Sequence, residues 1–167
     1  IELSGFKGGD RTNIELPKVQ RNFLKALKEA GKKVVFVNCS GSAIALTPET
    51  ESCDAILQAW YPGQEGGEAV ARVLFGEYNP AGKLPITFYK NSEQLPDFKD
   101  YSMKGRTYRY MNDALFPFGY GLSYTSFRIG DATLSNSILK KGEKITLKVP
   151  VSNVGKKDGT EIVQVYV

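Results

Sequence analysis

The sequence contains no histidine, only two cysteines and a single tryptophan. Without histidine, the chain cannot supply the base of a Ser-His or Cys-His catalytic pair, and it lacks the commonest protein ligand of zinc. Cys39 and Cys53 are too few for a disulfide scaffold or a thiolate metal site, so we expect both to be reduced and packed. We therefore expect this chain to bind no metal and no cofactor.

Long apolar runs and clustered charge are also missing. No apolar segment approaches the roughly 20 residues that span a bilayer. The sequence also shows no basic segment followed by an apolar one, which is the pattern of a secretion leader. The net charge is +4, but the basic residues are scattered among acids and not interleaved with aromatic residues. This pattern disfavours nucleic acid and membranes as partners. The first residues do not look like a natural N-terminus, so the missing leader says little about location.

An amphipathic helix is predicted in the first part of the chain. Apolar residues recur there at helical spacing and form one stripe. They are Leu16, Val19, Phe23, Leu24, Leu27 and Ala30. Pro17 suits the first turn, where its missing N–H costs nothing, and Gly31 suits the position just past the helix end.

Two apolar runs without alternation, at 33–38 and 54–60, predict parallel strands covered on both faces. Residues 43–46 between them predict a helical turn, and 66–75 predict a second helix. Residues 80–89 follow as a loop and a short strand. This alternation of strands and helices favours an α/β fold with mainly parallel pairing.

The pattern changes after residue 97. Residues 98–124 are rich in aromatic residues and predict an irregular connector packed on a domain surface. Strands are then predicted at 127–129, 144–151 and 161–167, separated by turn residues, as in an immunoglobulin-like sandwich. Such a sandwich needs about seven strands, so we expect the chain to be truncated within this module. Its unpaired strands could associate with a second copy.

Two pairs of residues are candidates for a functional site. Asp10 and Arg11 follow two glycines, and an adjacent arginine can hold a carboxylate ionised; the alternative is an ion pair that anchors the loop. Trp60 and Tyr61 follow a predicted strand, at the strand end where ligands of α/β sheets often bind. Further carboxylates are Glu2, Glu65 and Glu68, but Glu65 equally suits the first turn of a helix. No phosphate-binding glycine motif is present, which disfavours nucleotides.

Six segments, in this order, resemble the C-terminal half of glycoside hydrolase family 3. They are GFKGGDRT at 5–12 with Leu16-Pro17, residues 34–41, AWYPGQEGG at 59–67, LFGEYNPAGKLP at 74–85, GRTYRY at 105–110 and FPFGYGLSY at 116–124. The resemblance implies part of an α/β sandwich domain at 1–97, a connector at 98–124, and the start of a fibronectin type III-like domain at 125–167. The (β/α)8 barrel of such enzymes would lie outside this chain.

The resemblance implies a retaining, exo-acting β-glucosidase or β-xylosidase that hydrolyses terminal β-linked sugars. The family's nucleophile lies in the barrel, and its acid/base glutamate lies shortly before the segment matched by 5–11. We therefore expect no catalytic residue in this chain, with Asp10 and Arg11 supporting the acid/base loop and Trp60 and Tyr61 at the domain surface, near the site or under the connector. The parent enzyme would be periplasmic or secreted and would bind a β-linked oligosaccharide. The alternative is a non-catalytic module that binds carbohydrate or protein.

Overall fold

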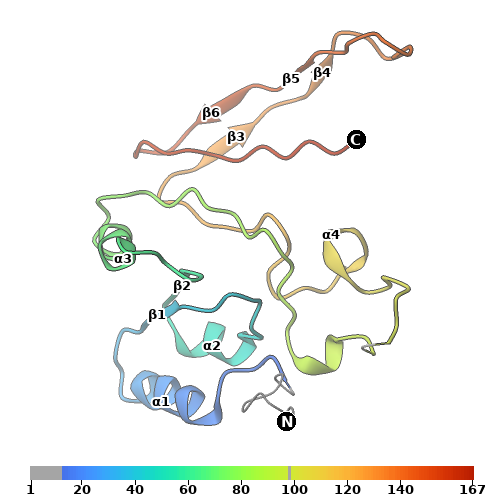
Figure 1. Ribbon diagram of the computed structural model, residues 1–167. Helices are drawn as coiled ribbons and strands as arrows, with labels where there is room; N and C mark the ends of the chain where they lie inside the picture. The colour runs from blue at the N-terminus through green and yellow to red at the C-terminus, as the bar shows by residue number, and fades with distance from the viewer. Residues whose placement is uncertain (1–12, 98) are drawn as a thin grey trace. The chain divides into compact units, whose positions relative to one another are not determined.

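The computed structural model describes residues 13–97 and 99–167, which divide into two compact units (Figure 1). The first unit comprises residues 1–70 and 83–120, and the second comprises 71–82 and 121–167. Helices in chain order are α1 (Lys18–Glu29), α2 (Thr47–Ser52), α3 (Gly66–Leu74), the 3-10 turn η1 (Ser92–Gln94) and α4 (Thr107–Tyr110). Strands are β1 (Val35–Asn38), β2 (Ala55–Gln58), β3 (Phe127–Ile129), β4 (Thr133–Leu134), β5 (Leu147–Lys148) and β6 (Val151–Asn153). Within the part of the chain that the structure describes, every helix is too short or too polar to traverse a bilayer.

The parallel strand pair of the first unit confirms the α/β prediction. β1 and β2 pair in parallel, with Val35 opposite Ala55 and Asn38 opposite Gln58. The expected cover on both faces is wrong for β1, because Val35 is half-exposed. Residues 43–46 are not a helical turn: Ala45 instead forms a parallel bridge with Glu15.

Helix α1 ends as predicted but packs on a narrower face. Gly31 adopts a positive φ of 70°, and its N–H donates to the carbonyl of Lys28 while the N–H of Lys32 donates to that of Leu27. This is the Schellman arrangement that favours glycine after a helix. Leu24 is buried, but Val19 and Phe23 are 74% and 63% exposed, so these two residues lie outside the packed stripe.

The core of the first unit gathers side chains from α1, the strand pair and the segment before α2. Its buried members are Leu16, Leu24, Val34, Ile44, Leu46 and Cys53. Burial raises the pKa of the Cys53 thiol, whereas Cys39 is exposed, so the expectation that both thiols are packed is wrong for Cys39. Phe88 is also buried and bridges Phe116 in antiparallel fashion, where a strand was predicted.

An ion pair ties α1 to α2 beside this core. The Nε atom of Arg21 donates to Oε1 of Glu49 at 3.1 Å, and the same guanidinium donates to the carbonyl oxygen of Ala45 at 3.2 Å. The Glu49 side chain is 1% exposed, and its Oε2 atom has no partner among the described residues. A buried carboxylate of this kind depends on its cation. Helix α2 was not predicted, because its sequence TPETES carries no apolar stripe.

The second unit contains two short antiparallel pairings, β3 with β6 and β4 with β5. The predicted strand at 127–129 is confirmed. The one predicted at 144–151 is instead split into β5 and the start of β6, with Pro150 between them, because proline lacks the N–H that a ladder needs. The strand predicted at 161–167 is wrong, since no strand forms there.

Hydrogen bonds of the Asn79 side chain hold the second unit together; we call this group the Asn79 clasp. Its Oδ1 accepts from the Ser123 hydroxyl at 2.9 Å and from the Tyr124 N–H at 2.7 Å, and its Nδ2 donates to the Asp158 carbonyl at 2.9 Å. Nearby, the Lys157 ammonium donates to the Gly76 carbonyl and lies 5.5 Å from the centre of the Tyr124 ring. Segments that are distant in sequence are thus joined by polar contacts.

Candidate functional site

The candidate site lies at the carboxyl ends of β1 and β2. The last residues of the two strands, Asn38 and Gln58, face each other, and Asn38 Nδ2 donates to Gln58 Oε1 at 2.6 Å. Gln58 Nε2 in turn donates to the Ser40 carbonyl at 3.0 Å, and the Ser40 hydroxyl donates to the Ser42 carbonyl at 2.9 Å. These bonds brace the loop after β1.

Trp60 takes a strained backbone conformation just after β2. Its φ is 57°, in the left-handed region that bulky residues rarely adopt, at a cost of order 1–3 kcal/mol. Such strain persists only where the surroundings hold the residue. Here the indole packs edge-on against the buried Phe88 ring, with 6.2 Å between the ring centroids, and Phe88 packs in the same way against Phe116. The tryptophan thus anchors the loop and is not fully buried.

Tyr61 is 80% exposed, yet part of its ring lies directly over Gly41. A Cβ atom added to Gly41 would lie 2.3 Å from Cε2 of the Tyr61 ring, closer than any real side chain could approach. Pro62, the residue after Tyr61, packs closely on Gly66: a Cβ atom added to Gly66 would lie 2.3 Å from Pro62 Cβ. The loop 60–66 therefore contacts the rest of the unit through Trp60 and Tyr61 and packs on itself at Pro62 and Gly66, while most of the Tyr61 side chain faces solvent.

The other candidates from the sequence fall into two groups. Glu65 and Glu68 are exposed at the start of α3, where the helix dipole favours acids. Glu2, Asp10 and Arg11 lie outside the described residues. Across residues 13–97 and 99–167, no three acidic or cysteine side chains converge to hold a metal ion.

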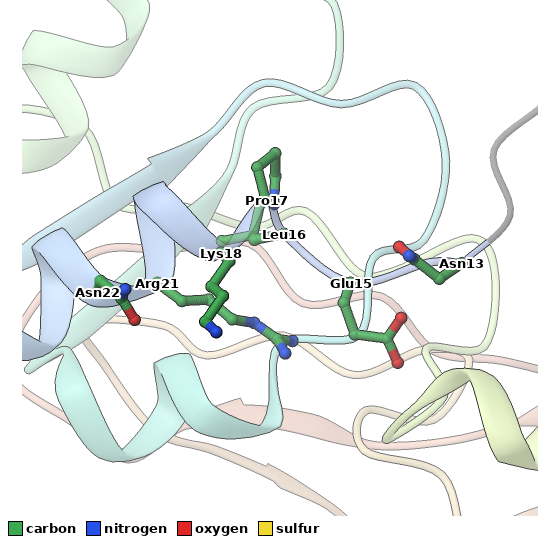
Figure 2. A pocket seen from close by; sticks show the side chains of 7 residues that line it. All are labelled: Asn13, Glu15, Leu16, Pro17, Lys18, Arg21 and Asn22. Atoms are coloured by element: carbon green, nitrogen blue, oxygen red, sulfur yellow. The ribbon is translucent and has the colours of Figure 1, made fainter.

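A surface depression at the start of α1 is the strongest rival to this loop (Figure 2). Its lining residues are Asn13, Glu15, Leu16, Pro17, Lys18, Arg21 and Asn22. The Glu15 carboxylate accepts the N–H and hydroxyl of Ser92, at 2.8 and 2.6 Å, and these bonds lower its pKa. Arg21 is bound to Glu49. The charges of Glu15 and Arg21 are thus already engaged, and none of the described lining residues is aromatic, so we favour the Tyr61 loop.

Sequence reasoning singled out Trp60 and Tyr61 as candidates, but not the residues that contact and brace their loop. Gly41 carried no visible signal, because its role depends on a ring that is 20 residues away in the sequence. Asn38 and Gln58 did carry one: each is a polar side chain at the end of an apolar strand, where a functional edge of a parallel sheet is expected.

Comparison with known proteins decides the family. The model of the glycosyl hydrolase family 3 C-terminal domain matches residues 3–124. This chain belongs to glycosyl hydrolase family 3. It is 68% identical over all its 167 residues to a xylan 1,4-β-xylosidase of Xylanibacter ruminicola, of which it covers 19%. It is 43% identical, over 96% of the chain, to a periplasmic β-glucosidase of Salmonella typhimurium, of which it covers 23%.

Solved structures of β-glucosidases are similar to this chain along most of its length. A β-glucosidase from Erythrobacter marinus superposes with a TM-score of 0.77 at 37% identity, covering 92% of this chain and 21% of that one. β-Glucosidase 3B of Thermotoga neapolitana, solved with glycerol, gives 0.77 at 30% identity and covers 93% and 24%. The chain thus spans about a fifth to a quarter of the proteins that it matches.

Proposed function

We propose that this chain is part of a retaining, exo-acting β-glycosidase that removes terminal xylose or glucose from β-linked oligosaccharides. The observation that carries the proposal is the 68% identity to a xylan 1,4-β-xylosidase along the whole chain, and it favours xylosides over glucosides. Retention requires two carboxylates about 5–5.5 Å apart. In this proposal both come from the rest of the enzyme, including its (β/α)8 barrel.

The chain itself acts as a scaffold in this proposal. Asp10 and Arg11 steady the loop that carries the acid/base glutamate, while Trp60 and Tyr61 form part of the wall beside the substrate. The position of Trp60 and Tyr61 just after β2, at the carboxyl ends of the parallel strands, supports their place beside the substrate, because ligands of α/β sheets bind at that edge. Residues 125–167 would begin a fibronectin type III-like domain, which the antiparallel pairings β3–β6 and β4–β5 support.

The proposed enzyme works outside the cytoplasm, in the periplasm or after secretion, as the name of the Salmonella relative suggests. Taken alone, the chain would pair its open strand edges with a second copy. Apolar side chains along the second unit support this association, because Ile129, Leu134 and Val151 are each at least 44% exposed.

Hydrolysis of aryl β-xyloside and aryl β-glucoside tests the proposal. We expect no turnover by the 167-residue chain alone, and turnover of the xyloside by a longer polypeptide that contains this sequence together with a barrel. Turnover by the isolated chain at a rate near that of an intact enzyme would refute the scaffold role. Inactivity of the longer polypeptide on both substrates would refute the glycosidase assignment.

A further inference from the structure

The Tyr61 ring and the glycine beneath it form a platform for a sugar. We propose that the exposed face of Tyr61 stacks on the apolar face of a pyranose ring in a β-linked xyloside or glucoside, and that Gly41 is the positioning residue for this ring. The inference rests on the proposed function for the class of ligand. It adds a specific contact and a residue that the sequence did not reveal.

The first argument is the asymmetry of the ring's surroundings. A side chain that is 80% exposed is normally free to rotate, but Tyr61 lies in close contact with Gly41. The contact is possible only because residue 41 lacks a Cβ atom, which would lie 2.3, 2.8 and 3.0 Å from three ring carbons. Gly41 therefore supports the ring from one side and leaves most of its surface open. An open aromatic face with a polar hydroxyl at its edge suits a ligand with one apolar and one hydroxyl-bearing side.

The second argument is that the platform is already ordered. Trp60 is held by Phe88 despite its strained φ, and Pro62 is held against Gly66, so the residues on both sides of Tyr61 are fixed. Asn38 and Gln58 brace the loop that carries Gly41. A ligand that meets a preordered surface does not lose binding energy to the ordering of that surface.

The third argument concerns strain at Trp60. A left-handed, non-glycine residue costs free energy and persists only where the surrounding structure holds it. At Trp60 this conformation turns the chain so that the indole packs inward on Phe88 while the next residue faces solvent. The strained backbone at Trp60 therefore helps to direct the Tyr61 side chain towards solvent.

The test is titration of the 167-residue chain with xylobiose and with cellobiose. Trp60 is the only tryptophan and neighbours Tyr61, so its fluorescence reports binding at this loop; proton NMR of the sugar provides a second readout. The variants are Tyr61→Ala, Tyr61→Phe and Gly41→Ala. Gly63→Ala is the matched control, because a Cβ there meets nothing within 4 Å.

Loss of one stacking contact is expected to weaken binding about fivefold or more in Tyr61→Ala. Gly41→Ala is expected to weaken it to a similar extent, while Tyr61→Phe and Gly63→Ala stay within about twofold of the parent chain. Circular dichroism and thermal unfolding verify that Gly41→Ala is folded, and Tyr61→Ala removes the ring without any steric clash. Unchanged affinity in Tyr61→Ala would overturn the proposal, as would no binding of either sugar to the parent chain.

The two proposals fail in different ways. If a longer polypeptide hydrolyses aryl β-xyloside but Tyr61→Ala binds sugar as the parent chain does, the platform is refuted and the glycosidase assignment stands. If the chain binds sugar through Tyr61 but the longer polypeptide hydrolyses neither aryl glycoside, the platform stands and the assignment falls.

Discussion

The two units of this chain use different means to hold their shape. Among the described residues of the first unit, eight apolar side chains and three polar ones are buried, around a parallel strand pair and two helices. In the second unit, which the structure describes completely, every residue is at least partly exposed, and the Asn79 clasp joins segments that no apolar core joins. Burial stabilises in proportion to the apolar area removed from water, whereas partly exposed hydrogen bonds contribute little each. The first unit should therefore withstand far more denaturant than the second.

The largest expected effect is at Phe88. Phe88→Ala removes a ring that is 1% exposed and contacts both Trp60 and Phe116, and we expect it to lower the free energy of unfolding by about 3–5 kcal/mol. Phe75→Ala, at a position of the second unit that is 84% exposed, is the matched control, with an effect within about 0.5 kcal/mol. Urea denaturation followed by circular dichroism measures both. Equal losses of unfolding free energy in the two variants would contradict the expected difference in stability between the units.

Arg21 should come next. Arg21→Ala leaves the buried Glu49 carboxylate without its cation, and we expect a loss of about 2–3 kcal/mol in the same assay. Lys25→Ala breaks only the exposed contact between Lys25 and Glu29, so its effect should stay below about 0.5 kcal/mol. The double variant Arg21→Ala, Glu49→Leu should recover much of the loss, because the stranded charge is gone. Failure of this recovery would mean that packing of the Arg21 side chain matters more than its charge.

A smaller, local effect is expected at Asn79. Asn79→Ala removes the acceptor for Ser123 and Tyr124 and the donor to Asp158, at a cost of about 1 kcal/mol or somewhat more. Hydrogen exchange should accelerate at 121–125 and 157–159, while the β1–β2 amides keep their protection. Asn136→Ala, whose side chain accepts only from the nearby Ile138 N–H, should change neither region. Faster exchange in β1 and β2 would show that the clasp stabilises the whole chain.

The subtlest effect is a pH dependence at Asp54. The Val34 N–H, the Lys33 ammonium and the nearby Lys28 lower the pKa of Asp54 to about 2, from an ordinary value of 3.8. A carboxylate with a depressed pKa stabilises the folded state above its unfolded pKa, and this contribution disappears as the pH falls from about 4 towards 2. The difference in Tm between the parent chain and Asp54→Asn should therefore shrink over that range, and be constant above pH 5. Asp131→Asn, at an exposed position of the second unit, is the control; a constant difference at Asp54 would contradict the assignment.

Elements with a strong local signal were predicted well. The apolar runs at 33–38 and 54–60 predicted the parallel pair, and the glycine after α1 predicted its end. Helix α3 matched its predicted range to within one residue. In each case, a short segment carries enough information, because the signal is a side-chain pattern or a single special backbone angle.

Elements that depend on distant partners were predicted poorly. The alternating segment 161–167 resembles a strand, but a strand also requires a neighbour with matching hydrogen bonds. Residues 43–46 look helical by composition, yet Ala45 bridges Glu15 from far along the chain. The site shows the same limit: Trp60 and Tyr61 stand out as aromatic residues after a strand, whereas Gly41 gains its role only from the ring that covers it.

The two cysteines differ in a way that makes the Tyr61 loop accessible to chemistry. Cys39 is exposed between Asn38 and Ser40, whose side chains hydrogen-bond to each other, whereas Cys53 is in the core with its pKa raised by burial. Because the thiolate is the reactive form, an alkylating dye should modify the first sulfur in the native protein and reach the second only after unfolding. The unmodified sequence therefore allows a dye to be attached at Cys39, close to the Tyr61 loop. The rate at which Cys53 is labelled would report how often the core unfolds.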